Sequence, residues 1–229
     1  MSTSRTEAFS DGVFAIAATL LVLELKVPQV EPGGLASALL ENWPSYATYV
    51  VSFLTIGIIW VNHHAVLDRI RDVTRPLLFM NLVFLMAVAA VPFPTALLAD
   101  YLRAGHDESL AAAVYGGCMA LMGLTFGIIW SYVVLSDNLL REEVDPARAR
   151  RSLWIFTAGT PLYVLAIGVS VLSATFALII YALLALFYLF DVLPPLKQGG
   201  EEDRPRRIWV LGADETATAQ WSTLNRNCR

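Results

Sequence analysis

Two acidic residues bracket a short apolar segment near the beginning of the chain. Asp11 and Glu24 are separated by twelve uncharged residues, Gly12 to Leu23. As an α-helix this interval is about 18 Å long, which is shorter than the roughly 30 Å hydrocarbon core of a bilayer. A helix surrounded by lipid would not carry two acids so close to that core, so we expect protein or water around both ends. Ionisable groups inside a membrane helix indicate a functional site.

The helical phase of this segment separates two faces. At 100° per residue, one stripe holds Arg5, Phe9, Gly12, Ile16, Leu20, Leu23 and Val27. Thr19 and Glu24 flank it. The opposite side is a seam around Asp11 that suits close helix packing and contains Ala15, Ala18 and Val22. The pattern leaves two interpretations of the stripe open, packing against a neighbouring helix and lining of a pore, and by itself it favours packing.

The composition indicates a membrane protein. Hydrophobic residues make up 56% of the 229 residues and charged residues only 16%, and the mean hydropathy is +0.57. Typical globular domains carry about 25% charged residues, so most of this surface must face lipid or other helices. The net charge of −4 gives little support to a nucleic-acid partner. Cys118 and Cys228 are too few and too far apart for a disulfide framework.

Six apolar stretches, each bounded by charge, proline or glycine, predict an all-α fold: a polytopic membrane protein with about six transmembrane helices. They cover approximately residues 9–27, 43–66, 77–101, 110–135, 153–172 and 175–193. Pro92 and Pro94 should kink the third helix, and the charged run 141–151 predicts a solvated loop. We expect a six-helix transmembrane domain over residues 1–197 and a cytoplasmic C-terminal tail over residues 198–229.

The basic residues are distributed unevenly between the connections. Lys26 and Arg103 lie beside the first and third connections, whereas the other fourteen lie at the N-terminus, in the second and fourth connections, or in the tail. Such an excess marks the cytoplasmic side of a membrane protein. The pattern therefore predicts a multi-pass protein of the cell membrane with both termini cytoplasmic.

A set of motifs then follows in a fixed order. Arg5 is followed by Phe9-Ser10-Asp11-Gly12 and the apolar segment VFAIAATLLVLEL, and later by GIIWVNHHAVLDRI at 57–70, by Asn81 and by PFPT at 92–95. Together these segments resemble the signature of the transmembrane protein 175 potassium-channel family. Six helices instead of twelve resemble its prokaryotic branch. The resemblance implies a homotetramer whose pore is lined by the first helix of each subunit.

The resemblance also implies roles for residues of the first helix. The family's hydrophobic constriction matches Ile16, further narrow rings match Leu20 and Leu23, and a hydroxyl linked to potassium preference matches Thr19. Helical phase places these residues on or beside one stripe, so we prefer the pore to the packing interpretation. The carbonyl filter Thr-Val-Gly-Tyr-Gly of other potassium channels is absent from the sequence, as it is from the family. A structural network at the cytoplasmic end is implied for Arg5, Phe9, Ser10 and Asp11.

Ser10 and Asp11 point away from the stripe and need partners, because a buried unpaired carboxylate costs several kcal/mol. We expect hydrogen bonds to polar residues of the second and third helices, with these candidates: Trp60, Asn62, His63, His64 and Asn81. Adjacent histidines point about 100° apart on a helix, and His64 with Asp68 supplies only two ligands, so we predict no metal site. A role of His64 in pH dependence stays open.

Three classes of function are compatible with a small helical membrane protein. We prefer a modestly potassium-selective cation channel with a hydrophobic constriction, with K⁺ and the bilayer as partners and no cofactor. Glu24 would lie at the external pore mouth and concentrate cations there. A small secondary transporter of a cation or small solute is the alternative, although we find neither inverted repeats nor broken helices. An intramembrane enzyme would need convergent catalytic residues, and the His and Asp residues are too sparse for that.

Overall fold

The structure, a computed structural model, describes residues 3–136 and 138–190. Its elements are α1 (Thr3–Leu20), the 3₁₀ turn η1 (Leu21–Glu24), α2 (Leu35–Glu41), α3 (Trp43–Asp68), α4 (Arg75–Ala90), α5 (Pro92–Ala104), α6 (Glu108–Leu135), α7 (Pro146–Ser170) and α8 (Ala174–Phe190). The all-α fold class is therefore confirmed. The predicted tail over residues 198–229 lies outside the described residues, and the division into two domains stays a prediction.

The six predicted apolar stretches each coincide with a helical segment. Within the described chain, five segments are long and apolar enough to cross a membrane: Thr3–Glu24, Trp43–Asp68, Arg75–Ala104, Glu108–Leu135 and Pro146–Ser170. The sixth, Ala174–Leu189, is apolar but shorter. The short helix α2, in the connection between the first two spans, was not predicted.

Prolines interrupt the third span as expected. Helix α4 ends at Ala90 and α5 begins at Pro92, with Pro94 in its first turn. Proline has no N–H to donate to the preceding turn and its ring clashes with the carbonyl there. The predicted kink is therefore confirmed, and it divides the span into two packed helices.

Helix α7 begins earlier than the apolar pattern suggested. The Asp145 side chain accepts a hydrogen bond from the Ala147 backbone N–H at 2.9 Å, and Pro146 occupies the first helical position. An acidic cap followed by proline is a strong start signal for a helix. The charged run 141–151 is thus partly helical, and the prediction of a solvated loop over its whole length was wrong.

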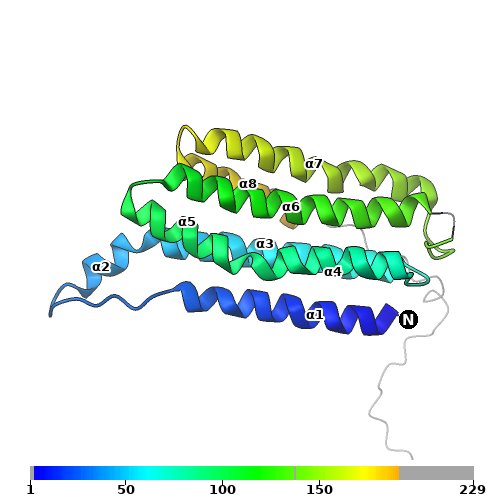
Figure 1. The fold of residues 1–229 in the computed structure, drawn as a ribbon, viewed down its shortest axis with the longest axis horizontal. Coiled ribbons are helices and arrows are strands. Elements are labelled where there is room, and N and C mark those ends of the chain that lie inside the picture. The colour runs from blue at the N-terminus through cyan, green and yellow to red at the C-terminus, as the bar shows by residue number, and fades with distance from the viewer. Residues whose placement is uncertain (1–2, 137, 191–229) are drawn as a thin grey trace, which may run out of the picture. The chain divides into compact units, whose positions relative to one another are not determined.

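Helix α1 lies at one edge of the bundle. It packs against α3 and α4, while α6 packs most extensively against α7 and also contacts α4 and α5. Figure 1 shows α1 alongside α3 and α4, with α6 and α7 on the far side of them. One side of α1 is consequently attached to the bundle, and its other side is largely uncovered by the described helices.

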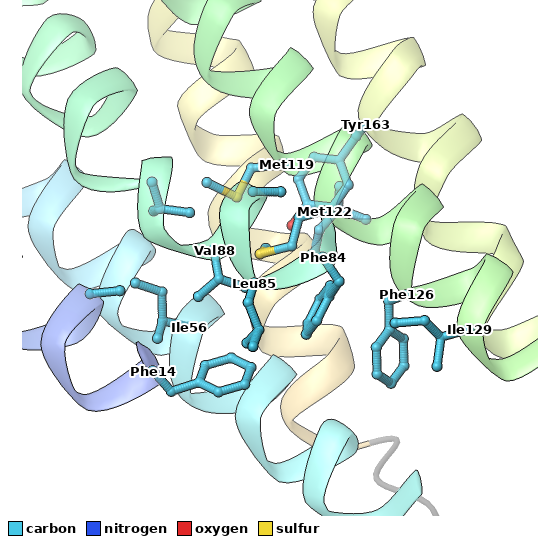
Figure 2. Packing of buried hydrophobic residues seen from close by; sticks show 14 of the residues in the cluster. Phe14, Ile56, Phe84, Leu85, Val88, Met119, Met122, Phe126, Ile129 and Tyr163 are labelled. Carbon is cyan, nitrogen blue, oxygen red and sulfur yellow. The ribbon is translucent and has the colours of Figure 1, made fainter. Parts of the chain in front are cut away.

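An aromatic cluster attaches α1 to the bundle. Phe14 is 3% exposed, and its ring centroid lies 6.0 Å from that of Phe84 on α4 and 5.5 Å from that of His63 on α3. Phe84 in turn lies 5.5 Å from Phe126 on α6. Figure 2 shows Phe14 pointing from α1 into the cluster that contains Ile56 and Phe84. The core of the bundle therefore extends into α1 through this side chain.

The adjacent glycines Gly116 and Gly117 of α6 show how closely α6 packs against α7 and α8. A Cβ added at Gly116 would overlap the Tyr181 hydroxyl and lie 2.7 Å from Ile167 Cγ1. That hydroxyl is held in place because it donates to the Ala112 carbonyl at 3.0 Å. A Cβ at Gly117 would meet nothing within 4 Å.

We expect Gly116→Ala to lower the free energy of unfolding by about 1–2 kcal/mol. Overpacking costs about 1–3 kcal/mol, which exceeds the roughly 1 kcal/mol that alanine gains over glycine in a helix. The matched variant Gly117→Ala should be neutral or stabilising. Thermal unfolding of both variants in the same detergent measures the difference. Equal melting temperatures would show that α6 and α8 are not packed as closely as described.

Candidate pore-lining helix

The stripe identified on the first helix is exposed. Ile16 is 61% exposed, Leu20 41% and Leu23 71%. Only 28% of the apolar window of this span is buried, against 50% for the span of α3. The stripe therefore does not pack against another of the described helices, and its apolar side chains are left for lipid, for a second copy or for a pore.

The buried side of α1 differs from the predicted seam. It consists of Thr6, Ser10, Phe14 and Ala17, continued by Leu21 in η1. Ala15 and Val22 of the predicted seam are exposed, Ala18 is half-buried, and so is Asp11. The packed face is turned by roughly 100° from the seam, because Phe14 and Ser10 supply the contacts that fix α1. Within the described part of this chain, the packed face is therefore that of Ser10 and Phe14 and not the predicted seam around Ala15 and Val22.

The 3₁₀ turn η1 affects the alignment of the stripe. Side chains three residues apart eclipse each other in a 3₁₀ helix, whereas they are about 60° apart in an α-helix. Leu20 immediately precedes η1, and Leu23 lies within it. The turn therefore brings these two leucines closer to one line along the helix axis.

Thr19 lies on the exposed flank of the stripe. Its hydroxyl lies 2.9 Å from both the Ala15 and Ile16 carbonyl oxygens and donates its proton back to the helix. A hydroxyl that donates inward keeps its lone pairs free to accept from water or to contact a cation. Thr19 thus offers an oxygen ligand beside Ile16 in an otherwise apolar segment.

Asp11 and Ser10 are bonded to neighbouring helices. The Trp60 indole N–H donates to Asp11 Oδ1 at 2.8 Å. The Ser10 hydroxyl donates to the Thr6 carbonyl at 2.8 Å and accepts from Asn81 Nδ2 at 3.1 Å. Two of the expected partners, Trp60 on α3 and Asn81 on α4, are therefore brought to the motif.

The bonds of Asn81 extend to α3 and form a buried chain. Asn81 Oδ1 lies 2.8 Å from His63 Nε2. Ser10, His63 and Asn81 are at most 4% exposed. One amide thus connects a hydroxyl of α1 with an imidazole of α3. Buried polar groups of this kind are costly when unpaired and specify one arrangement when paired.

His64 connects the start of α1 with the end of α3. Its Nδ1 lies 2.7 Å from Glu7 Oε1, and its Nε2 lies 3.6 Å from Asp68 Oδ2. The sequence analysis did not propose Glu7 as a partner of His64, although Glu7 lies four residues before Asp11 and therefore on the same face of the helix. His64 and Asp68 are largely exposed. One imidazole thus contacts two carboxylates, one from each helix end.

Three residues of the predicted network lie elsewhere. Arg5 and Phe9 are exposed on the stripe side of α1 and not beside Ser10 and Asp11. Asn62 is buried, but its amide nitrogen donates to the Ile58 carbonyl of its own helix at 3.1 Å. It faces away from α1, because it lies about 100° around α3 from His63. The prediction that Asn62 joins the motif network was therefore wrong.

A second network lies at the other end of α1, and it was not predicted. Lys26, two residues beyond Glu24, pairs with Asp100 of α5 at 3.0 Å. Arg103 also pairs with Asp100 and donates to Asn42 Oδ1 at 2.9 Å. Both basic residues of this end therefore share one carboxylate. Glu24 is half-buried.

Comparison with known proteins identifies similar chains over most of this length. Residues 5–92 match the family described as endosomal/lysosomal potassium channel TMEM175. A potassium channel of Streptomyces collinus is 50% identical over 191 residues, covering 83% of this chain and 93% of the relative. A potassium channel of Chamaesiphon minutus is 40% identical over 190 residues, covering 81% and 93%. The crystal structure of a lysosomal potassium-selective channel TMEM175 homolog from Chamaesiphon minutus matches with a TM-score of 0.76 at 38% identity, covering 82% of this chain and 97% of that one.

Proposed function

This chain belongs to the TMEM175 potassium-channel family, and on that premise we propose that it conducts potassium through a pore lined by α1 of each subunit. The chain is a multi-pass membrane protein. The observation that carries the proposal is the exposed stripe of α1, which holds Ile16, Leu20 and Leu23. The relatives are named as channels, and none of these names favours the alternative of a secondary transporter.

The exposure of α1 supports assembly into an oligomer, and we propose the tetramer that the motif resemblance implied. Both the stripe and the neighbouring side with Ala8, Ala15 and Val22 are exposed. A central pore covers only one of these sides. The small side chains of the other suit close packing against α1 of the next subunit.

The proposed pore closes through an apolar neck. A ring of Ile16 side chains leaves water without hydrogen-bond partners, so the neck dewets and an ion faces a dehydration barrier. Potassium sheds water at lower cost than sodium does. The Thr19 hydroxyl beside Ile16 accepts contacts from a partly dehydrated ion. The arrangement supports modest potassium selectivity without a carbonyl filter.

Ion flux into liposomes tests the proposed function. Protein is reconstituted into potassium-loaded vesicles, which are diluted into sodium medium, and the experiment is repeated with the two ions exchanged. We expect gradient-driven flux that does not saturate and that is faster for potassium than for sodium. Saturable flux coupled to a second ion would support a transporter instead, and the absence of flux would contradict both.

We also propose that Glu24 raises the cation concentration at the external mouth. Glu24→Gln should lower potassium flux by about twofold to fivefold at low salt and have little effect at high salt. Salt shortens the Debye length from about 30 Å at 0.01 M to about 10 Å at 0.1 M. Glu41→Gln, an exposed glutamate of α2, is the matched control. Equal flux of both variants at low salt would remove this role of Glu24.

The described arginines support cytoplasmic termini, which we propose for this chain. All of them except Arg103 lie at the end of the bundle where α1 begins (Figure 1), and these are Arg5, Arg69, Arg71, Arg75, Arg141, Arg148, Arg150 and Arg151. Lys26 and Arg103 lie at the opposite end. A cysteine introduced at Ser4, with both native cysteines replaced by serine, should react with an impermeant maleimide only from the cytoplasmic side.

A further inference from the structure

A cavity lies on the face of α3 that is turned away from α1. Its volume is about 60 Å³, and residues of α3, α6, α7 and α8 line it. Most of the lining is apolar, with Met119, Met122 and Phe126 from α6 and Ala185 from α8. Figure 2 shows Met119, Met122 and Tyr163 gathered in this part of the bundle. No described residue of α1 contributes to the lining, so the cavity is separate from the proposed pore wall.

Asn62 brings an unpaired acceptor to this apolar lining. It is 4% exposed, and its amide nitrogen is satisfied by the Ile58 carbonyl. Its Oδ1 is buried and has no hydrogen-bond partner among the described residues. Buried side-chain acceptors almost always have a partner, either protein or an ordered molecule. An acceptor of this kind in a cavity wall points to a bound hydrogen-bond donor.

Three other side chains of the lining carry hydroxyls, and these are Thr55, Tyr163 and Tyr188. Thr55 Oγ1 donates to the Val51 carbonyl at 2.7 Å. None of these hydroxyls forms a hydrogen bond with Asn62 Oδ1, which has no partner among the described residues. A guest molecule that carries its own donor would satisfy this acceptor.

The size of the cavity restricts the guest further. One water takes up about 30 Å³ in the liquid, whereas an apolar cavity of about 150 Å³ holds benzene. A volume of about 60 Å³ therefore fits one or two waters or an organic molecule of a few heavy atoms. A charged guest is excluded, because the lining offers no countercharge for a buried ion.

We propose that this cavity binds a small hydroxyl compound, water or a short-chain alcohol, whose O–H donates to Asn62 Oδ1. Water and a short-chain alcohol share the required chemistry, because each carries an O–H donor and each is small enough for the cavity. The apolar lining favours the alcohol, since its carbon atoms fill volume that a single water leaves empty. The proposal concerns binding alone and does not depend on ion conduction.

Crystals of the full chain, grown with and without 2-bromoethanol, test the proposal. The bromine marks the alcohol by its anomalous signal, and an ordered water marks the alternative source. We expect density within hydrogen-bond distance of Asn62 Oδ1 in both, with a bromine peak in the cavity in the first. Water without bromine would support the proposal with water as the source. A cavity that is empty in both would overturn it.

Two variants separate a specific site from a passive void. Asn62→Leu keeps the shape of the side chain and removes the acceptor, so the density beside residue 62 should be lost. Ala185→Val adds two methyl groups to the lining and should exclude the alcohol through volume alone. In detergent, 2-bromoethanol should raise the Tm of the unmodified chain relative to Asn62→Leu. A bromine peak of equal height in Asn62→Leu would overturn the assignment of Asn62.

Discussion

Replacing Ile16 with asparagine is expected to raise potassium flux through the reconstituted protein by about tenfold. Ile16 is 61% exposed on α1, so the change leaves the packing of a single chain intact. In the proposed pore it places an amide where the apolar neck excludes water, and a hydrated neck lowers the barrier for the ion. A barrier reduction of about 1.4 kcal/mol corresponds to a tenfold increase in rate. The liposome flux assay measures it directly.

The matched control for this change is an isoleucine exposed elsewhere on the bundle. Ile128 on α6 is 46% exposed and belongs to a different span, and Ile128→Asn introduces the same amide without touching α1. Flux through this variant should equal that of the unmodified chain. An equal increase in both variants would mean that asparagine makes the vesicles leak. No increase in Ile16→Asn would show that Ile16 does not form the constriction.

The largest loss of stability is expected from replacing Asn81 with leucine, by about 2–4 kcal/mol. Asn81 bonds both Ser10 and His63, and all three side chains are buried. Removing one partner leaves a buried polar group at a cost of about 1–3 kcal/mol. His63 would lose the most, because its Nδ1 already has no partner among the described residues and its Nε2 would then lose Asn81. Chemical denaturation followed by tryptophan fluorescence measures the change.

Asn62→Leu is the matched control, since Asn62 is equally buried on the same bundle. It removes one bond within α3 and an acceptor that has no partner among the described residues. Exchanging such a group for an apolar isostere is nearly neutral. We therefore expect a change below about 1 kcal/mol. A loss for Asn62→Leu as large as that for Asn81→Leu would contradict the distinction between the two amides.

Helical phase in the sequence identified the exposed stripe of α1 but not the helices that α1 packs against. The spacing of Ile16, Leu20 and Leu23 determines a face of the helix whatever surrounds it. The buried side was misplaced because alanines suit both a packed and an exposed position. Ser10 and Phe14 fixed the actual orientation, and their contacts to α3 and α4 are long-range.

Some contacts of the candidate site could be predicted from the sequence and others could not. A carboxylate in a membrane helix, such as Asp11, needs a hydrogen-bond donor. Few polar side chains lie in the segment around Trp60, so the candidate donors could be named from the sequence. The pairing of Lys26 with Asp100 joins residues 74 positions apart in the chain, and no local sequence pattern predicts it. Asn62 was assigned to the wrong side, because one step along a helix turns a side chain by 100° and the reference direction was unknown.

The attachment of Phe14 constrains how the proposed neck can widen. An axial rotation of α1 that turns Ile16 out of the neck would also withdraw Phe14 from the aromatic cluster, where it is 3% exposed. Exposing a buried phenylalanine costs about 1.5–3 kcal/mol in each subunit. A tilt that carries α1, α3 and α4 together as one rigid body leaves that cluster intact. The gate of this protein would then be the position of three helices, and its hinges would lie in their connections.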